Sequence, residues 1–363
     1  DTGGELRVTA EADWLRAALS YSPQGRSRLD VSYLDLLRLD MDREQSAAED
    51  AADDEAVEQE IIQLPDLAVT IAGLRRGDTV LGNLSFDLHS EGVELHAQNI
   101  RGDIAAMKLR AEEPGALVWH QGANSRTLMA ARLHFQDLGV TLGQLGYQKV
   151  IETDQGYFDL ALEWPGGPQD YSLLAGLGSV DVDIGKGTFP EASGGTAGTL
   201  KVVSILNLAE IVRRLSLTQM FESGIPFNRI DGRAQLGGGT IDVSNMSVQG
   251  SASRFQFSGK SVVESQTLAG ELVVTLPVAN NLPWVAALAA GLPVAAGVFL
   301  LSKVFESQVD RLTSAVYSVA GTWDDPEVTF DRVFDNTAAA DAANPAADAA
   351  AATKGSQSPS ESP

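Results

Sequence analysis

Apolar residues recur at every second position along most of this chain, and this alternation limits the possible folds more than any other feature. In the segment FDLALEW, Phe158, Leu160, Leu162 and Trp164 share one side of an extended chain. Such a period of two is typical of half-buried β-strands. Other segments give the same pattern: Val180, Val182 and Ile184; Ile241 and Val243; Phe255 and Phe257; Leu6 and Val8. Glycine-rich turns separate these segments, so the sequence predicts a mainly β, antiparallel protein.

Two segments interrupt the alternation and favour short helices. We expect one helix over residues 12–20 (ADWLRAALS). A second is expected over residues 205–216, where Leu208, Ile211, Val212 and Leu215 share one side of the helix. We expect this second helix to close one end of a sheet rather than to act alone.

The longest apolar run is Leu282–Leu301, which is 20 residues without a charge. Its length is enough for a membrane-spanning helix. However, nine of these residues are Leu, Val or Phe, six are Ala, and Pro293 interrupts the middle of the run. A proline in a helix interior costs about 3 kcal/mol, so the net gain from spanning a bilayer is close to zero.

The prolines of this run are better explained as helix starts. Asn281 can cap a helix that begins at Pro283 and ends near Gly291, and Pro293 can begin a second helix. The second helix has an apolar stripe: Val298, Leu301, Phe305, Val309 and Leu312. We therefore expect a helical hairpin, and membrane span, core packing and lipid contact remain as its possible roles.

The charge of the chain is −23, which argues against binding to nucleic acids because these require a basic surface. Residues 40–60 hold ten acidic residues and one basic residue, a composition typical of a disordered insertion. The tail 331–363 also has no apolar periodicity.

The chain has no cysteine, which excludes disulfides and thiolate chemistry. Because the sequence begins at Asp1 without a signal segment, we expect it to be the C-terminal part of a longer protein.

Motifs for catalysis are missing from the sequence, and we expect no catalytic, cofactor or metal site. The four histidines, His89, His96, His120 and His134, do not form a metal-binding pattern. No Gly-x-Ser-x-Gly elbow is present, and the glycines of LGGGT at 236–240 do not form a phosphate-binding loop. The chain is therefore not expected to be an enzyme.

Several blocks in the second half of the chain resemble one known family. They are LGYQKVIETDQGYFDLALEWPGGPQDYSL, GKGTFPEASGGTAGTLKVVSILNLAEIVRRLSL, MFESGIPFNRIDG and SVAGTWDDPEVTF, in this order between about Leu142 and Phe330. In this order they resemble the C-terminal region of the AsmA-like envelope proteins of the YhdP type, relatives of TamB. The sequence departs from the family at Gly291-Leu292-Pro293, where a Gly-Pro pair is usual, and in the acidic insertion.

The resemblance implies a long antiparallel sheet that curls into an open apolar groove. It implies a periplasmic protein, anchored in the inner membrane by a segment outside this sequence, with this end towards the outer membrane. The implied function is the transfer of phospholipid between the two membranes, with acyl chains, the outer-membrane leaflet and envelope proteins as partners. A scaffold that aids outer-membrane protein assembly is the alternative, and a polysaccharide-acting protein is weakened by the few Trp and Tyr residues.

These arguments give a set of domains and candidate residues. The expected domains are 1–39 (β with a short helix), 40–60 (insertion), 61–279 (curled β-groove), 280–320 (helical hairpin), 321–330 (final strand) and 331–363 (tail). The groove candidates are Phe158, Leu160, Leu162, Val180, Val182, Ile184, Ile241, Val243, Phe255 and Phe257. The candidates for membrane contact or gating are Trp284, Val285, Leu288, Leu292, Val298, Phe299, Leu301 and Phe305.

Overall fold

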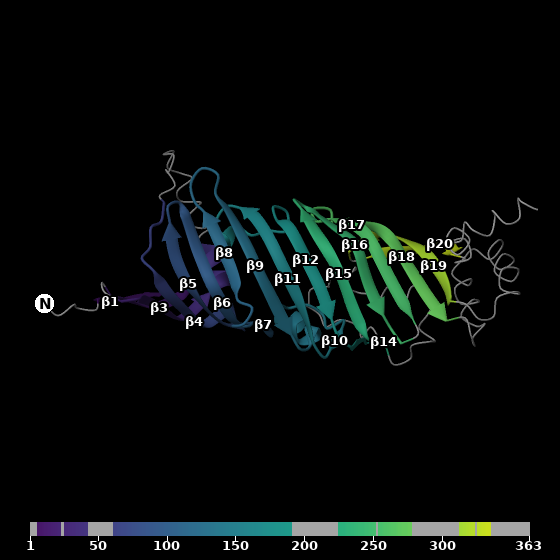
Figure 1. The fold of residues 1–363 in the computed structure, drawn as a ribbon, viewed down its shortest axis with the longest axis horizontal. Helices are drawn as coiled ribbons and strands as arrows, with labels where there is room; N and C mark the ends of the chain where they lie inside the picture. Colours follow the sequence, from purple (N-terminus) through teal and green to yellow (C-terminus); the bar gives the residue numbers. More distant parts are fainter. Residues whose placement is uncertain are drawn as a thin grey trace, which may run out of the picture.

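The protein is a long, curved β-sheet whose strands run obliquely across the long axis of the molecule (Figure 1). The computed structural model describes residues 6–22, 25–42, 61–190, 224–251, 253–277, 312–323 and 325–334. Within these ranges, 17 strands form one sheet and three short strands form a second one. The prediction of a mainly β protein is therefore confirmed.

The N-terminal half of the large sheet contains nine strands. They are β1 (Leu6–Ala12), β2 (Leu15–Tyr21), β3 (Ser27–Asp35), β4 (Leu67–Arg76), β5 (Thr79–Glu91), β6 (Glu94–Ile104), β7 (Met107–Leu109), β8 (Gly115–His120) and β9 (Arg126–Phe135). Each strand pairs with the next except for β7 and β8, which both lie between β6 and β9 and pair with those two strands. Among the described strands, all pairs in this sheet are antiparallel except β3 and β4, which are parallel.

The C-terminal half continues as an antiparallel series of eight strands. They are β11 (Gly156–Pro165), β12 (Leu177–Ile184), β15 (Arg229–Gly237), β16 (Thr240–Gln249), β17 (Arg254–Val262), β18 (Thr267–Pro277), β19 (Leu312–Thr322) and β20 (Pro326–Phe334). Strand β11 pairs with β9 and joins the two halves. The register shifts within several pairs, including β15–β16 and β16–β17. Such bulges increase the right-handed twist and so contribute to the curvature of the sheet.

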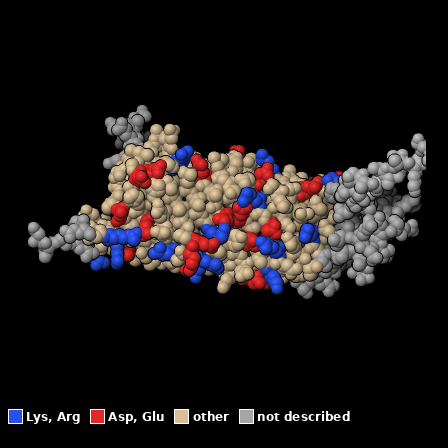
Figure 2. Space-filling view, in the orientation of Figure 1, with Lys and Arg blue, Asp and Glu red and all other residues tan. Residues whose placement is uncertain are grey.

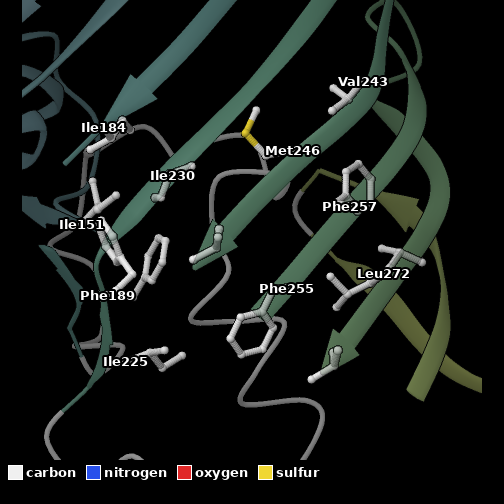
Figure 3. Packing of buried hydrophobic residues seen from close by; sticks show 14 of the residues in the cluster. Ile151, Ile184, Phe189, Ile225, Ile230, Val243, Met246, Phe255, Phe257 and Leu272 are labelled. Atoms are coloured by element: carbon white, nitrogen blue, oxygen red, sulfur yellow. The ribbon is translucent and has the colours of Figure 1, made fainter. Parts of the chain in front are cut away.

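A small sheet and short helices lie beside the large sheet. The small sheet contains β10 (Glu152–Thr153), β13 (Gly187–Phe189) and β14 (Ile225–Phe227), and the helices are α2 (Leu138–Gln144), the 3-10 turn η1 (Pro168–Asp170) and residues 36–42. Phe189 and Ile225 of the small sheet pack into one core with residues of the large sheet (Figure 3). Leu138 of α2 belongs to the same core. The small sheet and α2 thus cover part of one face of the large sheet.

The expected helix at residues 12–20 is wrong, because this segment is the hairpin of β1 and β2. Helix propensities of Leu, Ala and Arg amount to a few tenths of a kcal/mol per residue, and tertiary context overrides them. Here Ala17 and Leu19 pair with β1 on one side and with β3 on the other. Both edges of the segment are therefore hydrogen-bonded as a strand.

Three other boundaries also differ from the expectation. Strand β19 begins at Leu312, so the expected helical range 280–320 is wrong at its C-terminal end. Strand β20 ends at Phe334, inside the expected disordered tail, and the final strand of 321–330 is in fact parts of two strands. The helix at 36–42 extends into the expected insertion. The rest of the insertion, the helix expected at 205–216, and most of the hairpin and tail lie outside the described residues.

Candidate functional site

The inner face of the large sheet, defined as the face that Leu160 and Phe257 share, is a series of apolar rows. Cross-strand partners share a face in an antiparallel sheet, so the residue pairs of the register show which residues form each row. The central row crosses nine strands from β9 to β20. It contains Leu133, Phe158, Val182, Gly232, Met246, Phe257, Leu272, Tyr317 and Phe330.

Three further rows flank the central row and have the same apolar character. One contains Ala131, Leu160, Val180, Ala234, Val243, Gly259, Gly270, Val319 and Val328. Another contains Phe135, Gly156, Ile184, Ile230, Val248, Phe255, Val274 and Ala315. The last contains Met129, Leu162, Gly178, Leu236, Ile241, Ser261 and Leu268. The structure thus brings all ten expected groove residues onto one face.

The exposure of this inner face changes along the sheet. Leu160 on β11 and Val180 on β12 are half-buried. Phe255 on β17 is 2% exposed and Leu272 on β18 is completely buried. Of the ten candidates, Phe158, Leu160, Val180, Val182 and Ile241 are half-buried, whereas Leu162, Ile184, Val243, Phe255 and Phe257 are buried. Solvent therefore reaches the two middle rows at β11 and β12, where Phe158, Leu160, Val180 and Val182 lie, and is excluded at Phe255, Phe257 and Leu272.

A pair of glycines makes room for Phe257 on this inner face. Gly259 on β17 faces Gly270 on β18. A Cβ atom added to either glycine would lie 2.8 Å from Cζ of Phe257. The ring of Phe257 therefore occupies the space above both glycines. Aromatic rings cover glycines in other β-sheets in the same way. The alternation of the sequence did not predict this glycine pair.

The outer face, opposite the apolar rows, is charged. Figure 2 shows acidic and basic side chains side by side on the face turned toward the viewer. Arg132 on β9 donates to Asp159 on β11 at 2.5 Å and to Glu113 at 2.8 Å, and it stacks on Tyr157. Arg233 on β15 makes two hydrogen bonds with Asp181 on β12, at 2.5 and 2.7 Å. These paired charges are typical of a sheet face in contact with water.

A shallow hollow of about 550 Å³ lies on this outer face, above the bulge of β16 at Ser244. Its lining includes the carboxylates of Asp159, Asp181, Asp183 and Asp231. Arginines pair with these carboxylates: Arg132 with Asp159, Arg233 with Asp181, and Arg229 with Asp183 and Asp231. The hollow is therefore part of the ionic network of the outer face.

The histidines interact with carboxylates. His96 and His120 contact the two oxygens of Glu94 at 2.9 and 3.0 Å. The hydrogen bond from His134 is the main cause of a lowered pKa of Glu113, and the hydrogen bond to Asp66 raises the pKa of His89. Among the described residues, no group of three His, Cys, Asp or Glu side chains is placed to hold a metal ion.

The Trp-Pro-Gly-Gly-Pro segment lies at the end of β11, where Trp164 is buried in a small apolar cluster with Leu162 and Leu236. The indole of Trp164 is 2% exposed and donates to the carbonyl of Gly167 at 2.8 Å. The backbone N–H of Gly167 donates in turn to Asp170, and Thr127 donates to the carbonyl of Gly166. Gly166 has a positive φ of 89°, which a residue with a side chain rarely adopts. The motif thus fixes the loop between β11 and β12.

Tyr317 is an inner-face residue that the sequence reasoning missed. The alternation of Ala315, Tyr317 and Val319 could have identified it, but this segment was assigned to the helical hairpin. All three side chains are buried in the core of the C-terminal half. The ring of Tyr317 packs edge-on against Phe330, with centroids 5.7 Å apart.

The eight candidates for membrane contact or gating lie outside the described residues. They are Trp284, Val285, Leu288, Leu292, Val298, Phe299, Leu301 and Phe305. Within the ranges that the structure describes, no helix combines the length and the hydropathy needed to cross a membrane.

Comparison with known proteins gives one positive finding for this chain. The model of the family described as YhdP protein matches residues 1–328. No curated protein and no solved structure matches the chain. The match covers the charged outer face and all four apolar rows except for the last residues of β20.

Proposed function

The chain belongs to the YhdP family, and from this premise we propose that its inner face is a conduit for the acyl chains of phospholipids. In this proposal the protein works in the periplasm, and this part lies towards the outer membrane. The observation on which the proposal rests is the continuity of the four apolar rows from β9 to β18.

The two faces of the sheet differ in the way that a lipid conduit requires. Leaving an apolar face in water costs about 25 cal/mol for each Å². Leu160 and Val182 nevertheless remain half-buried on the inner face, whereas their strand neighbours Asp159 and Asp181 form ion pairs on the outer face. Acyl chains need no hydrogen bonds, so such apolar side chains are sufficient to bind them. Movement along similar rows changes the free energy little, as transport requires.

The burial of the inner face at β17 and β18 favours a second function for this part of the sheet. Phe255 and Leu272 are already covered, as in a scaffold whose inner face packs on itself. A scaffold that supports outer-membrane protein assembly requires only this packing. The two functions differ in what contacts the half-buried residues on β11 and β12.

Site-specific photocrosslinking in cells that express the full-length protein distinguishes the two functions. A photoreactive amino acid at Leu160 is expected to crosslink to phospholipid, because this side chain lies on the inner face. The same amino acid at Ala161 is the matched control, since it is next in sequence and points to the outer face. Crosslinks from position 160 to protein alone, or equal lipid crosslinking from both positions, would contradict the conduit.

A further inference from the structure

Tyr317 has the only side-chain hydrogen-bond donor in the central row. Its cross-strand partners are Leu272 on one side and Phe330 on the other. The side chain is 3% exposed. Within the part of the chain that the structure describes, its hydroxyl has no hydrogen-bond partner. The hydroxyl is thus a buried polar group inside an apolar surface.

Such an unpartnered group is unfavourable and needs a physical reason. Burial of a hydroxyl without a hydrogen bond costs about 1–3 kcal/mol. A water molecule is a poor partner, because a buried water needs two to four polar neighbours and the adjacent row members are apolar. Burial also raises the pKa of Tyr317 above the usual range, so the phenol keeps the proton that it can donate.

We propose that the Tyr317 hydroxyl donates a hydrogen bond to a neutral acceptor oxygen of a bound lipid, the ester carbonyl of a phospholipid. This inference rests on the proposed function, since it assumes that lipid occupies the inner face. The hydrogen bond would fix the position of the lipid on an otherwise uniform apolar surface, because the ester groups would then lie at β19. The acyl chains then extend along the row toward Val182 and Phe158, where the apolar face is half-buried.

The surroundings of Tyr317 favour an ester carbonyl over a phosphate. A buried anion needs a cation beside it, since an unpaired charge costs far more to bury than a neutral group. Arg332 on the neighbouring strand β20 pairs with Glu271 at 3.1 Å. Glu271 precedes Leu272 on β18 and therefore points to the outer face. The Arg332–Glu271 ion pair thus lies on the opposite face of the sheet from Tyr317. A neutral carbonyl needs only the one donor that Tyr317 supplies. Because Tyr317 is 3% exposed, this proposal requires that the residues covering it move aside when lipid binds.

The test compares two phospholipids that differ only in the carbonyl. Purified chain is titrated with dioleoyl phosphatidylethanolamine and with its diether analogue in competition with a fluorescent phospholipid. The wild-type protein is expected to bind the diester about fivefold more tightly, the effect of one neutral hydrogen bond. The variant Tyr317→Phe is expected to bind both lipids with the weaker affinity. Tyr157→Phe on the outer face is the control and should keep the preference.

The outcomes separate this inference from the proposed function. Equal binding of diester and diether to the wild-type protein overturns the role of Tyr317 and leaves the conduit intact. Binding of neither lipid overturns both. The wild-type comparison needs no variant, so it does not depend on folding of Tyr317→Phe. If the hydroxyl has no partner in the lipid-free protein, Tyr317→Phe is expected to unfold at the same or a higher urea concentration.

Discussion

The side-chain amide of Gln121 makes the pair of hydrogen bonds with Ile62 that a neighbouring strand would make. The backbone N–H of Ile62 donates to Oε1 of Gln121 at 2.8 Å, and Nε2 of Gln121 donates to the carbonyl of Ile62 at 3.1 Å. Gln121 follows β8, and Ile62 precedes β4. Gln121 therefore attaches the start of the segment 61–66 to the turn between β8 and β9, and the Ser90 hydroxyl accepts a further hydrogen bond from the N–H of Leu64.

Replacing this amide tests whether it holds the segment in place. Gln121→Ala leaves the N–H and the carbonyl of Ile62 without partners and is expected to cost about 1 kcal/mol. Backbone amides at 61–66 should then exchange with deuterium faster, whereas those of β11 and β12 should not change. Gln121→Glu is the matched control, because it keeps the acceptor and loses the donor, and its effect should be intermediate. Unchanged exchange at 61–66 in Gln121→Ala would contradict this role.

The buried carboxylate of Asp35 predicts a dependence of stability on pH. Asp35 is 1% exposed and accepts hydrogen bonds from the backbone N–H groups of Leu37 and Gly77. Burial by itself raises the pKa of Asp35, but its hydrogen bonds outweigh this effect and hold the pKa below the ordinary value. Because the pKa is lowered in the folded state, the stabilisation is complete above the pKa of the unfolded chain. It is lost as the pH falls below about 4.

Urea unfolding between pH 3 and pH 7 measures this effect. We expect the wild-type protein to lose more stability on acidification than Asp35→Asn, which has no carboxylate to protonate at this position. At pH 7 the variant should be less stable, because the amide nitrogen that replaces Oδ2 can neither accept a hydrogen bond from the Tyr33 hydroxyl nor pair with Arg38. The same slope against pH in both proteins would show that Asp35 does not contribute to acid sensitivity.

The outer-face network predicts that arginine is needed at position 132. Arg132 binds Glu113 and Asp159 together and stacks on Tyr157 at 4.8 Å. A lysine keeps the charge but loses the planar group that makes these contacts at once. Because the side chain is 35% exposed, we expect Arg132→Lys to cost at most about 1 kcal/mol in thermal unfolding. Lipid crosslinking from position 160 should not change, since that side chain lies on the opposite face.

The packing of Phe257 over Gly259 and Gly270 predicts that both glycines are intolerant of a side chain. Gly259→Ala brings a methyl group within 2.8 Å of Phe257 Cζ and 2.6 Å of a backbone oxygen. Overpacking of this kind costs about 1–3 kcal/mol. Phe257→Ala removes the ring and is expected to cost about 3–5 kcal/mol through the cavity that it leaves. In the double variant the methyl group has more room. Its loss of unfolding free energy, measured with urea, should therefore be smaller than the sum of the losses in the two single variants.

The sequence predicted the strands of this fold well where one face is apolar and the other is polar. On β11, Phe158 and Leu160 alternate with Asp159 and Ala161, and period two alone gives the correct face. Because cross-strand partners share a face, the same alternation on β12 and β17 placed the groove candidates on one face without knowledge of the strand order.

Other features depend on contacts that a local pattern does not contain. Residues 12–20 have helix-forming side chains, and only their pairing with β1 and β3 makes them a strand. The parallel pairing of β3 with β4 joins segments separated by the acidic insertion. The hydrogen bonds of Gln121 and Asp35 likewise connect residues far apart in the sequence. Such long-range relationships become visible only in three dimensions.

The pairing of each strand with its immediate successor has a consequence for how such a molecule evolves. In the described part of the large sheet, β11, β12 and β15 to β20 each pair only with the strands before and after them in this sheet. A duplicated hairpin inserted into this series would extend the span by two strand widths, about 10 Å, and leave the cross-section unchanged. The length of the sheet is therefore set by the number of hairpins, as the length of a solenoid is set by its repeats.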